Sequence, residues 1–244
     1  MIRYRSVVFD CDSTLSALEG IEELAAGQRR EVEALTDAAM RGEVPLDQVY
    51  GRRLDLIRPT RSRVEALVSL YVDRLVDDAA AAVAGLRSAG VRVRVVSGGL
   101  LPAVLGLARH LGLSDDDVSA VPIHFDETGA YTGYDTAAPA ARAGGKAEVI
   151  RAWREASHLP GPVMFVGDGA TDLEARQEVD LFVAYAGVLD RPRVTAAAPV
   201  VLHARSLAPV LPLALGDMPP DDEAGRAVYD RGKRLIDEGS LEWK

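Results

Sequence analysis

The sequence predicts an α/β fold in which helices cover both faces of a parallel sheet and an all-helical segment is inserted early in the chain. Two observations carry this prediction. Short apolar runs rich in β-branched residues alternate with helical patterns over most of the chain, as expected for a parallel sheet with helical crossovers. Residues 17–75, in contrast, are helical in pattern with little strand character, which indicates an insertion between two strands.

The first strand is expected at Ser6–Phe9, a buried apolar run that ends at Asp10. Four helical patterns follow, the last of which begins after the break at Pro59: Glu19–Ala26, Arg30–Arg41, Leu46–Ile57 and a helix from about Ser62. We therefore expect a core made of residues 1–15 and 76–215, a helical cap of residues 16–75, and a C-terminal helical extension of residues 216–244.

The alternation resumes after the insertion. The expected elements, in order, are a helix at Asp77–Ala89 stopped by Gly90, a strand at Val91–Val96, a helix at Leu100–Leu111, a hairpin within His124–Thr136, a helix at Ala147–Ala156, a strand at Val163–Val166, a segment continuing the pattern at Leu173–Glu178, strands at Leu181–Ala184 and Val200–Leu202, and an amphipathic helix at Asp221–Ile236. The apolar face of this last helix can pack on the core or on a second subunit, so the sequence leaves a homodimer as an alternative to a monomer.

Bulk properties limit the classes of partner. The chain has 244 residues, enough for one α/β domain and a modest inserted domain, and 48% of them are hydrophobic. The net charge of -9 argues against nucleic acid or an anionic membrane as the main partner. A phosphorylated small molecule is compatible with this charge, because a bound cation can reverse the field locally.

Cysteine usage and hydropathy indicate the compartment. Cys11 is the single cysteine, so an internal disulfide is impossible and nothing indicates an oxidising compartment. No signal-peptide pattern and no apolar window of about 18 residues is present. We therefore expect a soluble, cytoplasmic protein.

The first polar cluster, Asp10-Cys11-Asp12-Ser13-Thr14, directly follows the first strand. Because side chains alternate along extended chain, Asp10 and Asp12 can point to the same side. Two carboxylates this close repel each other unless a cation or a shared proton lies between them. A solvated turn is the simpler interpretation of this cluster alone, and Cys11 is better explained as a small core residue than as a nucleophile.

Two further clusters provide groups that suit a phosphate. Ser97-Gly98-Gly99 follows a strand and precedes a helix, so it offers a hydroxyl and backbone N–H groups, although an ordinary turn explains it equally well. Lys146 follows two glycines in the first turn of a helix, where the helix dipole disfavours a cation. A nearby anion would explain this lysine, and a solvated side chain is the simpler alternative.

The fourth cluster is Gly167-Asp168-Gly169-Ala170-Thr171-Asp172, after the strand at Val163–Val166. A helix N-cap explains one of its aspartates but less readily both. Parallel strands bring their carboxyl ends to one edge of the sheet, so all four clusters should meet there. Four carboxylates without a histidine favour a hard divalent cation, Mg²⁺. The four histidines (His110, His124, His158 and His203) lie outside the clusters and receive no role.

These clusters, in this order and spacing, resemble the four motifs of the haloacid dehalogenase-like hydrolase superfamily. Within it, the runs Glu19–Ala25, Ala39–Pro45, Arg53–Pro59 and Gly144–Lys146 are similar to the phosphoserine phosphatase family. The resemblance extends from about Val7 to about Leu207. It implies a Rossmann-like parallel sheet with an inserted helical-bundle cap, and a Mg²⁺-dependent phosphatase that acts through an aspartyl-phosphate, with phosphoserine as substrate.

The resemblance also implies roles for individual residues. Asp10 would be the nucleophile and Asp12 the general acid and base, while Ser97, Gly98 and Lys146 would bind the phosphate. Asp10, Asp168 and the Asp12 carbonyl would bind Mg²⁺, supported by Asp172. Four residues would contact the rest of the substrate: Glu19 at its ammonium, Arg53 at its carboxylate, and Met40 and Thr171, with Leu46 packing near Met40.

The chain departs from the family at several positions, and rival functions stay open. Thr171 stands where many members have asparagine, Leu46 where an aromatic residue is common, and Asp77–Ala80 where Pro-Gly is frequent. The tail beyond about Leu207 has no counterpart in the resemblance. The alternatives are a phosphotransferase that uses an alcohol such as homoserine, a phosphatase of another small phosphorylated metabolite, and a non-catalytic module that binds a phosphorylated ligand.

Overall fold

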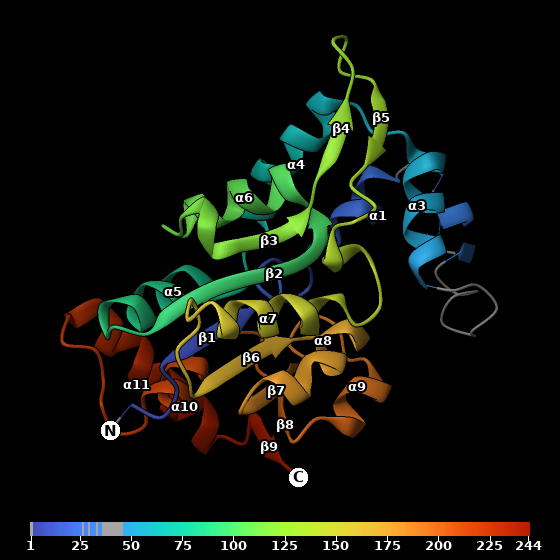
Figure 1. Cartoon of the computed structure of the whole chain (residues 1–244). Helices are drawn as coiled ribbons and strands as arrows, with labels where there is room; N and C mark the ends of the chain where they lie inside the picture. The colour runs from blue at the N-terminus through green and yellow to red at the C-terminus, as the bar shows by residue number, and fades with distance from the viewer. Residues whose placement is uncertain (1, 26, 29, 33, 36–45) are drawn as a thin grey trace.

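A computed structural model describes all residues except 1, 26, 29, 33 and 36–45. Within the described residues, seven strands form one sheet in the order β3-β2-β1-β6-β7-β8-β9 (Figure 1). Their bounds are β1 Ser6–Phe9, β2 Arg92–Leu100, β3 Val118–Val121, β6 Val163–Gly167, β7 Leu181–Tyr185, β8 Val200–Leu202 and β9 Leu241–Trp243. All pairings are parallel except that of β9 with β8, which confirms the expected parallel sheet.

The interior strand β1 is buried on both sides. Val7 pairs with Val93 of β2 and with Met164 of β6. Val7 and Phe9 pack into the larger apolar cluster, whereas Val8 packs into the smaller one on the opposite face. Alternation along the strand therefore supplies both cores, which is why β1 reads as a continuous apolar run.

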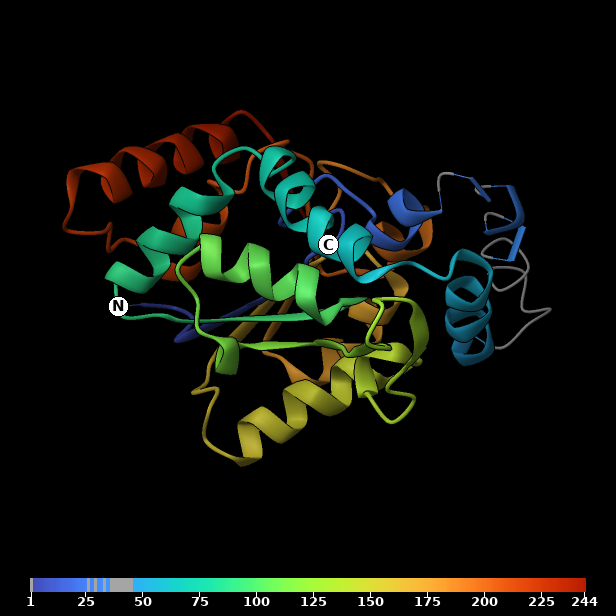
Figure 2. The same ribbon diagram turned by 90° about the horizontal axis from the view of Figure 1, so that it is seen from above.

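Helices cover both faces of the sheet (Figure 2). One face carries α4 Arg61–Asp73, α5 Ala79–Ser88, α6 Leu101–His110, α10 Val210–Leu215 and α11 Glu223–Asp237, and the other carries α7 Gly145–Glu155, α8 Ala170–Glu174 and α9 Pro192–Ala197. The helix expected at Asp221–Ile236 is confirmed as α11. Its N-cap is Asp222, whose side chain accepts a hydrogen bond from Gly225 N at 2.7 Å, and the helix packs on α5 and α10.

The inserted segment and a hairpin lie beyond the carboxyl ends of the strands. The helices α1 Gly20–Leu24 and α3 Leu46–Ile57 lie there beside the antiparallel hairpin of β4 Ile123–Phe125 and β5 Tyr131–Tyr134 (Figure 1). From this region α4 runs back against α6, and the two helices approach so closely that a Cβ at Gly106 would lie 2.4 Å from Val68. The helix expected at Arg30–Arg41 lies largely outside the described residues, and Met40 lies outside them entirely.

Two expectations about elements were wrong. The strand β2 runs on to Leu100 and includes Ser97-Gly98-Gly99, whereas the sequence predicts that this strand ends at Val96. The glycines are accommodated in a bulge rather than ending the strand, and α6 starts only at Leu101. The tail is not only helical, because Leu241–Trp243 adds β9 to the sheet. No helix among the described residues is long and apolar enough to cross a membrane.

Candidate active site

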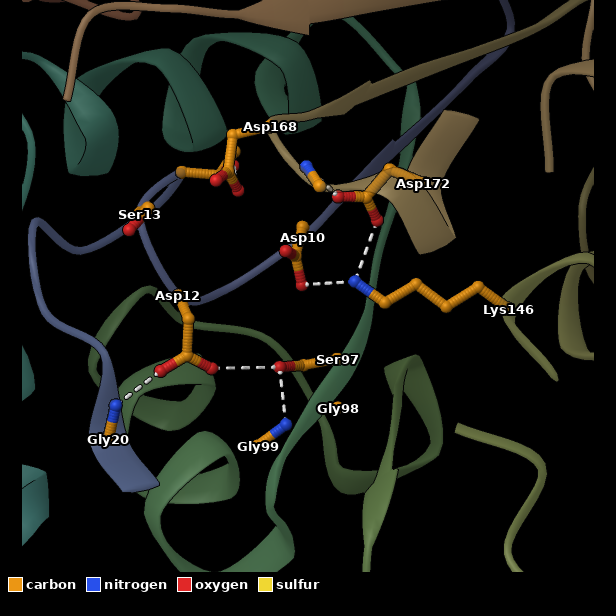
Figure 3. Close-up of polar contacts among 12 residues, drawn as sticks. Asp10, Asp12, Ser13, Gly20, Ser97, Gly98, Gly99, Lys146, Asp168 and Asp172 are labelled. Atoms are coloured by element: carbon orange, nitrogen blue, oxygen red, sulfur yellow. Dashed lines mark hydrogen bonds and ion pairs between the residues drawn. The ribbon is translucent and has the colours of Figure 1, made fainter. Parts of the chain in front are cut away.

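The four sequence clusters meet at the carboxyl ends of β1, β2 and β6 and at the first turn of α7 (Figure 3). They surround a cavity of about 200 Å³ between the sheet edge and the cap. Of the residues named from sequence, the cavity is lined by Asp10, Asp12, Glu19, Arg53, Gly98, Lys146, Asp168 and Thr171. Among the residues named from sequence, the site thus brings together side chains up to 161 positions apart, from Asp10 to Thr171.

Lys146 connects two of the carboxylates. Its Nζ lies 2.8 Å from Oδ1 of Asp10 and 2.6 Å from Oδ1 of Asp172, and all three side chains are buried (Figure 3). Burial lowers the pKa of Lys146, but the two neighbouring charges raise it more, so the ammonium stays protonated. The helix can start here because Gly145 has no Cβ; a Cβ would lie 1.6 Å from the Pro139 carbonyl oxygen.

Asp12 lies on the other side of Asp10 and is held by three donors. Its Oδ1 accepts hydrogen bonds of 2.7 Å from Gly20 N and from the Tyr71 hydroxyl, and its Oδ2 accepts one of 3.2 Å from Ser97 Oγ. Burial and the charge of Asp10 raise the pKa of Asp12, while the bonds from Gly20 and Tyr71 oppose this shift. A carboxyl group with a raised pKa can act as a proton donor near neutral pH.

Three buried carboxyl groups lie together where a metal ion is expected. Asp10, Asp168 and Asp172 each offer one oxygen, and these atoms lie within 4.8 Å of one another. Burial, followed by the charge of Asp10, raises the pKa of Asp168 to about 6 and that of Asp172 well above its usual range. Such a set of oxygens, unfavourable when all are ionised, fits a hard divalent cation.

Gly167 makes this cluster possible. A Cβ at Gly167 would lie 2.5 Å from Cγ of Asp172, so any other residue would push that carboxylate away. Asp172 also accepts a hydrogen bond of 2.8 Å from Gly169 N through Oδ2, which fixes its orientation at the start of α8. Asp172 therefore lies behind the cavity and positions Lys146, whereas Asp168 faces the cavity.

Arg191, which sequence reasoning missed, is a further cation at this site. Its Nε donates to Oδ2 of Asp168 at 2.8 Å and its Nη2 donates to Oε1 of Glu19 at 3.0 Å. Thr14 also donates to Asp168, at 3.3 Å. Arg191 follows β7 in a loop that carries no recognisable motif, so only a neighbouring charge in the fold reveals it.

The cap contributes groups of opposite charge. Burial, followed by the charge of Asp12, raises the pKa of Glu19 to about 8, although Arg191 and a 2.7 Å hydrogen bond from Ser13 counteract the shift. Arg53 of α3 has a side chain that is only 17% exposed and lies 4.0 Å from Glu22, and its buried Nε has no hydrogen-bond partner among the described residues. Arg53 thus brings an unsatisfied donor to the residues that line the cavity.

Cys11 is not among the residues that line the cavity. Cys11 is fully buried, and burial raises the pKa of its thiol well above the usual range, which agrees with a core role. Among the described residues that line the cavity there is no histidine. Neither Met40 nor the side chain of Leu46 lies within the described parts of the chain.

Comparison with known families agrees with this site. The sequence model of the haloacid dehalogenase-like hydrolase family matches residues 4–180. This match spans more than half of the chain and includes all four clusters. The chain belongs to the haloacid dehalogenase-like hydrolase family.

Individual relatives within this family have a more specific name in common. The chain is 36% identical over 191 residues to the phosphoserine phosphatase of Homo sapiens, covering 78% of this chain and 84% of that protein. It is 37% identical over 195 residues to the chloroplastic phosphoserine phosphatase of Arabidopsis thaliana, covering 78% of this chain and 66% of that protein. A solved substrate-bound phosphoserine phosphatase complex superposes with a TM-score of 0.75 at 25% identity, covering 87% of this chain and 99% of that one.

Proposed function

We propose that this chain hydrolyses O-phospho-L-serine to L-serine and phosphate through an aspartyl-phosphate on Asp10. The observation that carries the proposal is the pairing of Asp10 with Lys146 at 2.8 Å, beside a second carboxyl group, Asp12, in one buried cavity. A phosphoryl-transfer site requires a positioned nucleophile and compensated charge more than any other feature. Named relatives at 36–37% identity support phosphoserine as the substrate.

In the first step, a carboxylate oxygen of Asp10 forms a bond to phosphorus as the bond from phosphorus to the serine oxygen breaks. Asp12 gives its proton to the departing oxygen, and its raised pKa supports this role. Lys146 and Ser97 bind the phosphoryl oxygens and offset their charge. L-serine leaves, and the phosphoryl group stays on Asp10.

In the second step, Asp12, now ionised, removes a proton from a water molecule as the water oxygen bonds to phosphorus. The bond between phosphorus and Asp10 breaks, and the products are phosphate, the Asp10 carboxylate and a protonated Asp12. Asp10 and Asp168 would hold Mg²⁺, with Asp172 behind them, and the ion would supply positive charge that offsets repulsion between Asp10 and the substrate dianion.

Glu19 and Arg53 support an amino acid as the leaving group. A zwitterion needs an anion and a cation on the protein side, and these two residues supply them at the cap side of the cavity. The unsatisfied Nε of Arg53 suits a carboxylate, because a guanidinium binds carboxylates through paired hydrogen bonds. Arg191 would have to give up part of its contact with Glu19 when the substrate ammonium binds.

The proposal includes a reducing, cytoplasmic compartment, which suits a chain whose single cysteine is buried. No separate observation favours the phosphotransferase or the binding module over the hydrolase. Both Asp10 and Asp12 face the cavity, which a module that only binds phosphate does not require.

The test is phosphate release from L-phosphoserine with Mg²⁺ and with EDTA, beside phosphothreonine, a sugar phosphate, and phosphoserine with added homoserine. We expect metal-dependent release that favours phosphoserine and no phosphohomoserine. Asp12→Asn should lower kcat by about 10²-fold or more while the protein stays folded. Near-normal turnover of Asp12→Asn would contradict the acid–base role, and preference for another ester would contradict the substrate.

A further inference from the structure

The peptide group between Gly98 and Gly99 lies outside the hydrogen-bond ladder of the sheet. Val96 of β2 pairs with Ser119, and Leu100 pairs with Val121, so three residues of β2 lie opposite one residue of β3. Residues 97–99 therefore bulge from the sheet. Because both residues are glycine, rotation of this peptide meets little steric resistance, and other contacts must set its orientation.

Two hydroxyl groups hold this peptide. The Gly98 carbonyl accepts a hydrogen bond of 2.8 Å from the Tyr50 hydroxyl, and the Gly99 N–H donates one of 3.0 Å to Ser97 Oγ. The C=O and N–H of a trans peptide point in opposite directions, so fixing one fixes the other. Tyr50 thereby directs the Gly99 N–H towards Ser97.

Ser97 links the orientation of this peptide to Asp12 in the reaction centre. Its oxygen accepts from Gly99 N–H, so its single hydrogen is available for Asp12 Oδ2, 3.2 Å away (Figure 3). If the peptide rotated, the Gly98 carbonyl oxygen would take the place of the Gly99 N–H beside Ser97 Oγ, and the Ser97 hydroxyl would donate to this carbonyl rather than to Asp12. The hydrogen bond from Tyr50 thus opposes an orientation that would turn the Ser97 hydrogen away from the reaction centre.

Tyr50 belongs to the cap, not to the core that it contacts. It lies in α3, three residues before Arg53, and is 9% exposed. Its ring packs against that of Tyr134 of the hairpin, with 5.2 Å between the ring centroids. A Cβ at Gly51 would lie 3.0 Å from the Tyr134 hydroxyl oxygen, so the glycine beside Tyr50 permits this close approach.

We propose that Tyr50 is a positioning residue that couples the cap to the phosphate-binding groups. With α3 over the cavity, the Tyr50 hydroxyl orients the Gly98-Gly99 peptide, and this peptide orients Ser97 towards Asp12. The inference rests on the proposed function, because it assigns phosphate binding to this cavity. Residues 97–99 then hold the orientation that binds phosphate only when α3 lies over the cavity.

The test compares Tyr50→Phe with Tyr185→Phe. Tyr185 also donates a buried hydroxyl to a backbone carbonyl, that of Arg205 at 3.0 Å, but it lies away from the cavity. Three quantities are measured on both variants: kcat/KM for phosphoserine, the Kd of inorganic phosphate by titration calorimetry, and hydrogen exchange at the Gly99 amide.

For Tyr50→Phe we expect kcat/KM and phosphate affinity to fall by about fivefold, the factor for one neutral hydrogen bond, and the Gly99 amide to exchange faster. Tyr185→Phe should lower thermal stability and leave the other three quantities near wild type. Equal phosphate affinity and Gly99 exchange in both variants would overturn the inference. This comparison holds even if wild type hydrolyses no ester, an outcome that would contradict only the proposed function.

Discussion

The Tyr71 hydroxyl donates a hydrogen bond of 2.7 Å to Oδ1 of Asp12, from a helix 59 positions further along the chain. This bond stabilises the ionised carboxylate and opposes the rise in the pKa of Asp12 that burial and Asp10 cause. Tyr71→Phe should therefore raise the pKa of Asp12 further. We expect the limbs of the kcat/KM profile that report Asp12 to move to higher pH by about 0.7 unit, the equivalent of about 1 kcal/mol. An unchanged profile would contradict this, and Tyr185→Phe serves as the control.

Metal binding should depend on pH through Asp168. Its pKa is raised to about 6 by burial and by Asp10, and a carboxyl group must be ionised to bind a metal. We expect Mg²⁺ affinity, measured by titration calorimetry, to be high at pH 7.5 and to fall as the pH drops through about 6. Asp168→Asn should abolish the rise in melting temperature that Mg²⁺ gives to wild type. A pH-independent affinity would argue against this carboxylate as a ligand.

Lys146→Met should leave Asp172 buried without its partner cation. Removing one partner of a buried ion pair lowers the free energy of unfolding by roughly 3–5 kcal/mol. The pKa of Asp172, already raised in the folded state, should rise further, so the native state binds more protons than the unfolded state at intermediate pH. Stability should then decrease as pH rises from about 4, the unfolded value, towards the raised folded value.

Urea unfolding in EDTA at pH 5 and pH 7.5 measures this effect, with a larger loss expected at pH 7.5. The matched control is Arg151→Met, which breaks an exposed pair with Glu178 (N···O 2.6 Å) and should change stability by about 1 kcal/mol or less. If Lys146→Met were as stable as this control, Lys146 would not be needed to hold the carboxylates together.

Substrate recognition by Glu19 is tested with Glu19→Gln. The change should raise KM for phosphoserine by about tenfold or more, because a charge-assisted hydrogen bond to the ammonium is lost. KM for an ester without the ammonium group, such as phosphoglycolate, should change little in the same variant. Glu22→Gln, on the same helix with a side chain that is 42% exposed, is the control. An equal rise in KM for both esters would show that Glu19 does not bind the substrate ammonium.

Cys11 should be chemically inert in the native protein. Its thiol is buried and its pKa is raised, so little thiolate is present and a reagent has no access. We expect no alkylation by iodoacetamide without denaturant and near-normal kcat for Cys11→Ala. Rapid native alkylation, or loss of turnover without loss of folding, would return Cys11 to the list of candidate nucleophiles.

The sequence predicted the carboxyl ends of the strands well, because Val163–Val166 and similar runs are apolar, β-branched and followed by glycine and aspartate. Those same signals indicated Asp10, Asp12 and Asp168, and Lys146 was indicated by its place after two glycines at the start of a helix. The end of the strand expected at Val96 was wrong, because a pair of glycines gives no sign of a bulge within a strand that continues to Leu100.

Other functional groups have no sequence signal of their own. Tyr71 and Tyr50 read as ordinary apolar positions of helices, and their hydroxyl contacts depend on how the cap meets the core. Arg191 follows Asp190 in an unpatterned loop, and only the fold brings it to Asp168. Sequence thus indicates residues that motifs place at strand ends, and misses partners that tertiary packing supplies.

The antiparallel strand β9 has a consequence for self-association. It pairs with β8, whose residues Val200, Val201 and Leu202 are buried and apolar. Without β9, their unpaired backbone groups would form an exposed edge able to template pairing with another chain. β9 itself is a poorer template, because it carries the charged Glu242 and is followed by Lys244, whose Nζ lies 3.8 Å from Oε1 of Glu242. We therefore expect β9 to limit pairing of this sheet edge with other chains, a role separate from the chemistry at the carboxyl ends of β1, β2 and β6.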